Sequence, residues 1–309
     1  MNKLITLILL FTVVVFSGVA HAQQFPVVSQ YMQNHVFLNP GATAADGKGG
    51  AQLLHRSQWA GYDTYDDASG AQPQLQLLTA VTRLKERTDS TVHQRRHGLG
   101  LVFMRNKAAT LTTTDAKVSY AYHLPFTKKS TLALGVQAGM RFQSIDYAAF
   151  RVKHPDDPQL PGKGKETEGH SILTLGMWYE HEKYYIGIAA DAITNSSYNT
   201  LGVTTNRNWT LTAGYHFPAG AQGWKITPSI MALSNSDQYV IAGGVTASHN
   251  NSFWGGITYR HNEAASLMLG FGMLKQKRLH FSYAMDYITS NSELKAKTSH
   301  EVMIGYQWE

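Results

Sequence analysis

The feature that most constrains the fold of this chain is an alternation of side chains with a period of two, which recurs from about residue 50 to the C-terminus. From Leu279 to Tyr287, and again from Val302 to Trp308, apolar or aromatic residues occupy every second position. Successive side chains of a β-strand point to opposite faces, so this period predicts strands. We expect fourteen strands, near residues 50–59, 71–84, 96–106, 111–124, 130–143, 170–180, 183–191, 207–217, 223–233, 237–248, 251–261, 265–274, 277–288 and 298–308.

The composition of the two faces predicts a membrane barrel. One face is apolar, and the other consists mainly of Gly, Ala, Ser, Thr and Gln with an occasional Arg or His. Small polar residues suit the crowded interior of a barrel, whereas the outer face of a soluble sandwich is commonly charged. Aromatic residues lie near the ends of the predicted strands, as membrane-interface girdles require, and these are Tyr122, Phe142, Trp209, Phe217, Tyr287 and Trp308. The sequence therefore predicts an all-β, transmembrane antiparallel β-barrel of about fourteen strands. The alternative is an exported β-sandwich or a lectin-like jelly roll.

The connections between the predicted strands alternate in length. The short ones are 125–129, 181–182, 218–222, 249–250 and 275–276. The other set is mostly long and includes 60–70, 144–169, 192–206 and 289–297. Short periplasmic turns alternate with long outer loops in bacterial barrels, which also have an even number of strands. The charged connection 85–95 is an exception, because it is long but lies on the side of the short turns.

The N-terminus predicts export. Lys3 precedes an apolar run from Leu4 to Val19, and Ala20-His21-Ala22 forms a small-x-small cleavage site, so residues 1–22 are expected to be a signal peptide. The run is shorter than the ~20 residues of a spanning helix. We predict one further domain, made of an N-terminal periplasmic or plug segment at 23–49 and an outer-membrane barrel at 50–309.

Charge and cysteine content exclude some functions. The chain has a formal net charge of +6, its basic residues are scattered, and it contains no cysteine. These features, together with export, argue against nucleic-acid binding and against a disulfide framework.

The segment before the first predicted strand is rich in turn formers and contains Asn39-Pro40-Gly41. Asn before Pro favours an extended conformation, and Pro-Gly suits a turn. Two interpretations stay open for this motif: a simple corner into the first strand, or a docking surface or plug contact. With both termini in the periplasm, the segment is expected to lie under the barrel or to plug its lumen.

Four charged residues are predicted to point into the lumen, and these are Lys117, Arg141, Arg260 and Asp286. Inward charges either pair with each other to fill a narrow barrel or select solutes, and the first interpretation is favoured. His123, His216 and His280 are also predicted to face the lumen.

Motifs for catalysis, metals and cofactors are weak. No G-x-S-x-G elbow and no H-E-x-x-H occur, and the glycine-rich stretches at 47–50 and 162–165 lack the strand and helix that a phosphate cradle needs. His154 with Asp156 and Asp157 is the closest cluster with oxygen ligands that could bind a cation. Its spacing matches no known loop, so a solvated acidic loop is the favoured interpretation. We therefore predict no catalytic residue, no metal and no cofactor.

The N-terminal motifs resemble a known family. Ser29-Gln30-Tyr31-Met32, then Phe37-Leu38-Asn39-Pro40-Gly41, then Leu54 to Tyr62 (LHRSQWAGY) are similar to the PorP/SprF family of Bacteroidetes outer-membrane proteins. Later stretches agree, among them Tyr120 to Pro125 and His300 to Tyr306. Two departures are Gly41, where the family usually has Ala, and the C-terminal Trp308-Glu309, which places the aromatic residue before the end.

The resemblance implies a role in type IX secretion and gliding motility. It implies a non-enzymatic barrel that binds and anchors or positions secreted proteins with a C-terminal sorting domain, or binds periplasmic secretion components. The residues that carry the motif, and are therefore expected at a partner-binding or plug site, are Gln30, Tyr31, Asn39, Pro40, Arg56 and Trp59. The alternative is an outer-membrane porin or solute channel.

Overall fold

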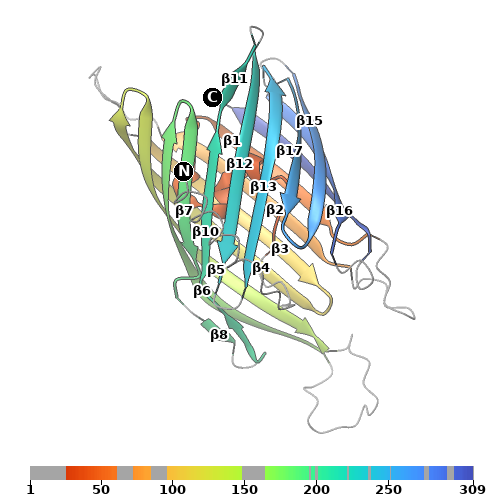
Figure 1. Ribbon diagram of the computed structural model, residues 1–309. Helices are drawn as coiled ribbons and strands as arrows, with labels where there is room; N and C mark the ends of the chain where they lie inside the picture. The colour runs from red at the N-terminus through yellow and green to blue at the C-terminus, as the bar shows by residue number, and fades with distance from the viewer. Residues whose placement is uncertain are drawn as a thin grey trace, which may run out of the picture.

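Antiparallel strands form most of the described part of this protein in its computed structural model, and neighbouring strands of the main sheet are hydrogen-bonded to each other (Figure 1). The structure describes residues 26–60, 72–84, 96–147, 164–194, 196–198, 201–220, 223–235, 238–250, 252–274, 278–290 and 296–308. The predicted signal peptide, the connection 85–95 and the group His154, Asp156 and Asp157 therefore lie outside the described residues.

The strands follow three short helical turns, η1 (Tyr31–Gln33), α2 (His35–Leu38) and η2 (Pro40–Ala42). The strands are β1 (Gly49–Ser57), β2 (Gln74–Leu84), β3 (Arg96–Ala108), β4 (Leu111–Thr127), β5 (Ser130–Asp146), β6 (Lys165–His181), β7 (Tyr184–Asp191), β8 (Ser196–Tyr198), β9 (Val203–Thr205), β10 (Asn208–Tyr215), β11 (Phe217–Ala219), β12 (Trp224–Ser234), β13 (Tyr239–His249), β14 (Phe253–Arg260), β15 (Ala264–Met273), β16 (Leu279–Ile288) and β17 (Thr298–Trp308). No helix in the described ranges is long and apolar enough to cross a membrane.

Closure of the sheet makes the barrel. β1 pairs with β17, and β10 pairs with β12, so the sheet order returns on itself. β10 and β11 are separated only by His216 and both pair with β12, so they are two parts of one strand. Counting them once leaves fourteen of the fifteen strands of the sheet, which confirms the predicted fold and strand number. β8 and β9 form a separate hairpin.

The two faces of each strand differ as the alternation predicts. In β15, Leu267 and Phe271 point outward and are about half exposed, at 53% and 49%, whereas Met268 points inward and is fully buried. Exposed apolar side chains cover the outside of the barrel, where lipid replaces water. The inside is less polar than the sequence predicts, because Leu54, Leu77 and Met104 also point inward.

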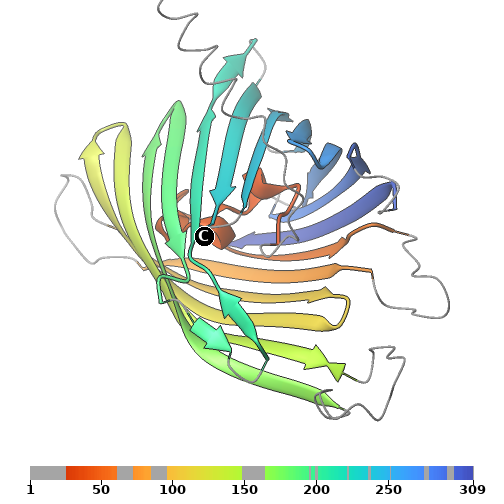
Figure 2. The same ribbon diagram turned by 60° about the horizontal axis from the view of Figure 1, so that its bottom comes forward.

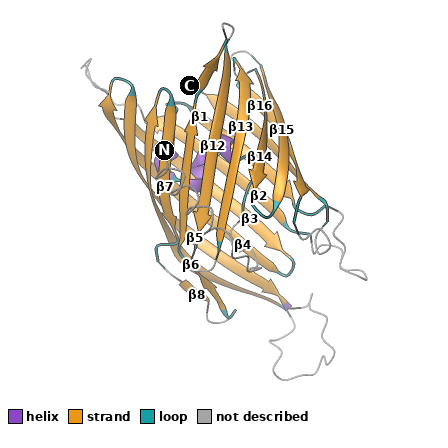
Figure 3. Ribbon diagram, in the orientation of Figure 1, coloured by secondary structure: helices purple, strands orange, loops and turns teal. Residues whose placement is uncertain are grey.

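The N-terminal segment, residues 26–48, explains these inward apolar side chains. Its three short helical turns lie inside the barrel (Figures 2 and 3). Its apolar residues pack with those of the wall in one buried cluster, which contains Val27, Val28, Tyr31, Phe37, Leu38, Leu54, Leu75, Leu77, Val102, Met104, Met231, Leu233, Ala242 and Met303. The hydrophobic core of this barrel is thus in its lumen.

The two ends of the barrel differ. β1 begins and β17 ends at one end, where the connections at 128–129 and 182–183 are only two residues long. Short turns and chain termini belong on the periplasmic side of such barrels, so the opposite end is the outer one. At the outer end β5 and β6 extend to Asp146 and Lys165, beyond their predicted limits, and form a projecting hairpin (Figure 1).

Candidate functional site

The N-terminal segment is hydrogen-bonded to strands all around the lumen. Gln52 of β1 donates to the carbonyl of Gln33 at 3.1 Å, and Gln137 of β5 donates to that of Val36 at 2.9 Å. Asn34 donates to Thr79 of β2 at 3.2 Å, and the hydroxyl groups of Tyr31 and Ser229 of β12 lie 3.0 Å apart. Strands that are distant in the sheet order are thereby joined through one segment.

Ser29 and Gln30 are held by charged side chains of the outer half of the barrel. The backbone N–H groups of both residues donate to the carboxylate of Glu301, at 2.9 and 3.0 Å. The hydroxyl group of Ser29 donates to Asp286 at 2.7 Å and accepts from Arg56 at 2.8 Å. Charge-assisted hydrogen bonds of this kind are roughly twice as strong as neutral ones.

The surrounding ion pairs are almost inaccessible to water. Arg56 contacts Asp286 at 2.7 Å and Glu301 at 3.2 Å, and these three side chains are at most 2% exposed. Arg260 also contacts Asp286, at 3.0 Å, and pairs with Glu263. We call the following residues the segment-bound cluster: Ser29, Arg56, Arg260, Glu263, Asp286 and Glu301.

Asn39 joins the segment to the opposite wall. Its side-chain amide donates to the carbonyl oxygens of Met177 in β6 and Ile188 in β7, at 3.0 and 3.1 Å. Met177 and Ile188 are register partners, so one amide bridges the two strands from inside. The side-chain oxygen of Asn39 accepts from the N–H group of Gly41 at 2.8 Å, which fixes the turn that follows.

Three glycines make room for this turn. Gly135 of β5 and Gly176 of β6 are register partners, and Gly187 lies on the adjacent β7. A Cβ atom at Gly135 would collide with the backbone of Pro40, and one at Gly176 with the side chains of Asn39 and Pro40. At Gly187 it would collide first with the ring of Trp178 and then with the amide of Asn39. Backbone-to-backbone packing of this closeness requires glycine.

His35 lies in an aromatic cage next to this turn. Its ring centroid is 4.9 Å from that of Trp178 and 4.8 Å from that of Tyr185, and these two rings stack on each other. Burial, which disfavours the imidazolium ion, and to a lesser extent the nearby His216 together lower the pKa of His35 to about 4. His35 is therefore neutral at physiological pH.

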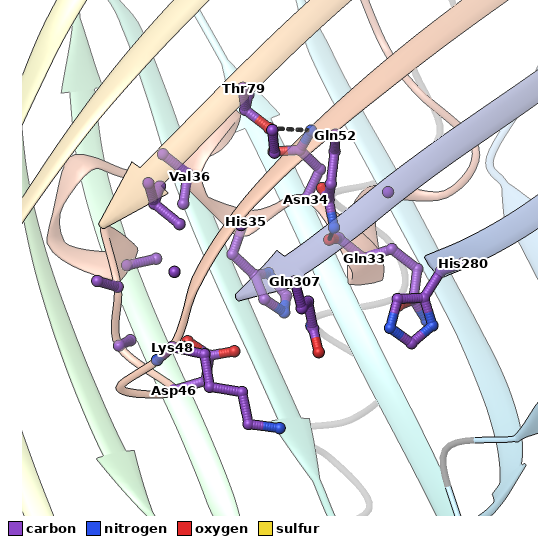
Figure 4. Close-up of a pocket in the computed structure, with 18 of the residues that line it drawn as sticks. Gln33, Asn34, His35, Val36, Asp46, Lys48, Gln52, Thr79, His280 and Gln307 are labelled. Atoms are coloured by element: carbon purple, nitrogen blue, oxygen red, sulfur yellow. Dashed lines mark hydrogen bonds between the residues drawn. The ribbon is translucent and has the colours of Figure 1, made fainter. Parts of the chain in front are cut away.

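A cavity of about 270 Å³ separates the segment from the wall on the periplasmic side. Figure 4 shows it between His35 and Gln33 of the segment, Gln307 of β17 and His280 of β16. Asp46 and Lys48 lie beside each other on the chain that leads into β1. The lining includes amides, imidazoles and aromatic rings together with the charged side chains of Asp46, Lys48 and Glu180, which suits a polar ligand or a peptide segment.

A second buried ionic cluster, the wall cluster, involves strands only. Arg141 of β5 makes two hydrogen bonds to Asp115 of β4, at 2.7 and 2.6 Å. Asp191 of β7 contacts Arg141 at 3.4 Å, and Lys117 and Thr174 at 3.3 and 2.5 Å. Together with the segment-bound cluster, this places Lys117, Arg141, Arg260 and Asp286 inside the barrel and confirms that they point inward and pair.

The residues expected at a partner-binding or plug site are only partly gathered. Gln30, Tyr31, Asn39 and Pro40 are buried on the segment, and Arg56 is buried on the wall beside Ser29. Trp59 lies apart from them beyond the outer end of β1, where its backbone N–H group donates to the hydroxyl group of Ser299 at 3.0 Å. The sequence interpretation missed Ser29, Glu301 and the three glycines, although the inward parity of Glu301 on its strand was visible.

The described residues contain no group of three or more His, Cys, Asp or Glu side chains that could hold a metal ion. The predicted absence of catalytic residues, metal and cofactor stays a prediction.

Comparison with known proteins gives a family and a fold. The family model described as "Type IX secretion system membrane protein PorP/SprF" matches residues 20–306. No curated protein matches the chain.

Among solved structures, the Ralstonia pickettii toluene transporter TbuX is 12% identical with a TM-score of 0.51, and covers 93% of this chain and 95% of its own. The CymD monoaromatic hydrocarbon channel is 11% identical with a TM-score of 0.56, and covers 92% and 93%. At this identity the likeness shows only the barrel fold.

Proposed function

The chain belongs to the PorP/SprF family of type IX secretion system membrane proteins, and from this premise we propose that it binds and anchors or positions a secreted surface protein at the outer end of its barrel. The proposed partner is a secreted protein with a C-terminal sorting domain. The protein acts by binding and has no enzymatic step.

The occupied lumen supports an action at the barrel ends. Residues 26–48 fill the middle of the lumen and are tied to β1, β2, β5, β12 and β17 by hydrogen bonds. A solute passing through the barrel would have to displace this segment together with its apolar core.

The observation that carries the proposal is a one-sided strand edge on the projecting hairpin. β6 pairs with β5 from Lys165 to His181, but with β7 only from Leu175 to Glu180. The carbonyl of Leu173 accepts from Ile193, and beyond it no strand in the described ranges is hydrogen-bonded to β6 on this side. The β8–β9 hairpin lies near β6, where the rings of Tyr198 and His170 are 4.5 Å apart, but it does not pair with β6. An extended strand of a partner can add to such an edge through main-chain hydrogen bonds.

The parity of β6 shows which backbone groups face the edge. Leu173 and Met177 direct their carbonyl oxygens toward the β7 side. Backbone direction alternates along a strand, so Lys165, Thr167, Gly169 and Ser171 face the same way. Thr167 and Ser171 are thus positions where proline removes an edge donor without removing a backbone hydrogen bond to β5, although Thr167→Pro also removes the side-chain hydrogen bond to Ser144.

The test is a pull-down of the tagged, full-length protein from native membranes, with identification of the bound proteins. We expect one large secreted protein, and we expect Thr167→Pro with Ser171→Pro to lose it while the barrel still folds. Ser290→Pro, in another outer connection, is the matched control and should retain it. Recovery of the barrel alone, with measurable conductance, contradicts the proposal.

Periplasmic secretion components are the other proposed partners. The cavity between His35 and His280 lies at the periplasmic end and has the size of a small peptide segment. Capture of periplasmic proteins that survives the two β6 prolines would assign binding to this end.

A solute channel is the second candidate function. The barrel fold shared with TbuX and CymD and the periplasmic cavity favour it. It predicts conductance in planar bilayers that rises when the segment-bound cluster is disrupted, whereas an anchoring barrel conducts poorly.

A further inference from the structure

The outer wall of the barrel carries a compact polar patch at the outer ends of β1 to β4. Register pairing places His55, Gln76, Arg105 and Thr114 in one row across the four strands. A second row, nearer the outer end, contains Ser57, Gln74, Lys107 and Thr112. We call these eight residues the outer polar patch.

All eight side chains point away from the lumen. Their neighbours along the chain, among them Arg56, Leu75, Leu77, Met104 and Asp115, point inward and are buried. Adjacent strands lie about 4.8 Å apart, so the patch is roughly 15–20 Å wide.

The boundary below the patch is sharp. The next row toward the periplasm contains Leu53, Leu78, Phe103 and Ala116, and its three large side chains are 42–53% exposed. This row belongs to the lipid-facing apolar surface. The two polar rows lie about 7 and 14 Å along the strands from this apolar row. The headgroup layer of a bilayer leaflet is about 5–8 Å thick, so the first polar row lies within it and the second just beyond it.

The patch is cationic and contains no acidic residue. Arg105 is exposed, and within the described part of the chain neither Arg105 nor Lys107 has an acidic partner. On β13, β14 and β16 the outward side chains at the outer end are aromatic instead, namely Tyr239, Tyr259 and Tyr287. Two cations at headgroup height without an acidic partner among the described residues can bind an anion, and the Gln and Thr side chains beside them provide hydrogen bonds for sugar hydroxyls.

We propose that the outer polar patch binds the phosphorylated sugar headgroup of an outer-leaflet glycolipid of the lipid A type. Arg105 presents its guanidinium fork to one phosphate, and Lys107 offers a second, more mobile charge. The acyl chains of the lipid lie on the apolar row below. The site is independent of the lumen and of the proposed partner, and a second copy of this patch is repelled by its like charge.

The test measures binding of lipid A to the full-length protein in a non-ionic detergent by native mass spectrometry. Arg105→Gln with Lys107→Gln should weaken binding about thirtyfold, since each cation near an anionic membrane surface contributes about 1 kcal/mol. Lys128→Gln with Lys183→Gln removes the same charge from two periplasmic turns and should leave binding unchanged.

The lipid itself supplies the second arm of the experiment. Dephosphorylated lipid A should bind the unaltered protein about as weakly as lipid A binds the patch variant. Equal loss in both double variants, or equal binding of dephosphorylated lipid, overturns the proposal. Full competition by inorganic phosphate at equal concentration overturns the assignment to a lipid. All variants change outward residues, so an unchanged heat-modifiable band on gels shows that the barrel has folded.

Discussion

The two buried ionic clusters of this barrel have similar chemistry but different partners. The wall cluster connects β4, β5 and β7 through Arg141, Asp115 and Asp191. The segment-bound cluster connects β1, β16 and β17 in the same way, but its carboxylates also accept hydrogen bonds from Ser29 and Gln30. Inward charges can therefore either join strands of the wall to each other or hold the N-terminal segment in the lumen, and only their hydrogen-bond partners distinguish the two roles.

The largest expected effect is on the segment-bound cluster. Glu301→Ala removes the acceptor for two backbone N–H groups and one partner of Arg56. Hydrogen bonds to charged groups contribute about 1.5–3 kcal/mol each, so docking of the segment should weaken by about 3–6 kcal/mol. Hydrogen exchange of residues 26–48 measures this. Unchanged protection there would contradict the distinction between the clusters.

A matched change in the wall cluster should separate the two roles. Arg141→Ala leaves Asp115 and Asp191 buried, and breaking a buried pair costs about 3–5 kcal/mol. We expect a lower urea midpoint for the whole barrel in lipid vesicles, while protection of residues 26–48 relative to the strands stays the same. Glu182→Ala, which breaks the exposed pair with Lys129, is the control and should change stability by less than about 1 kcal/mol.

Acid should release the segment through His35. The pKa of His35 is about 4 in the docked segment and its ordinary value is 6.5, so the released segment binds more protons between these pH values. Docking is therefore constant above about pH 6.5, weakens as pH falls to about 4, and then levels off. The shift of about 2.5 units corresponds to about 3 kcal/mol at most. His35→Phe keeps an aromatic ring packed against Trp178 and Tyr185 and should remove this part of the pH dependence of hydrogen exchange.

The smallest expected effect is at the three glycines that pack against the turn at Asn39, on the wall opposite the segment-bound cluster. Gly176→Ala places a methyl group against Asn39 and Pro40 and should weaken docking by about 1–3 kcal/mol. Gly243→Ala, on β13, meets only one backbone oxygen at 3.8 Å and is the control. Loss of protection from hydrogen exchange at residues 39–41 in the Gly176→Ala variant alone would support the close packing of Gly176 against this turn. Equal behaviour of the two variants would show that Asn39 is not held there.

The sequence predicts the barrel well because the alternation is local. Leu279 to Tyr287 carries its own evidence for a strand, and the structure has β16 from Leu279 to Ile288. The inward charges were also predictable, since parity on a strand fixes the face of Arg141 or Asp286. The limit of β6 was wrong because the hairpin continues past the membrane, where the apolar face ends and the alternation of lipid-facing residues no longer applies.

The site was only partly predictable, because its contacts are far apart in sequence. The Asn39-Pro40-Gly41 motif stood out, but Gly135 and Gly176 looked like any small inward residues of a barrel. Gly135 and Gly176 are register partners on β5 and β6, and the need for glycine at both positions follows only once the N-terminal segment is packed against them. Glu301 likewise becomes part of the site only through Ser29, 272 positions earlier in the chain.

That long separation has a consequence for the order of assembly. Ser29 and Gln30 find their acceptors on the last two strands of the described chain, β16 and β17, and β17 also closes the barrel against β1. Contacts of such high sequence separation form late, since the loop between them must first be ordered. The N-terminal segment is synthesised first but can dock only after β16 and β17 have formed. A docked segment is therefore a sign that the barrel is complete.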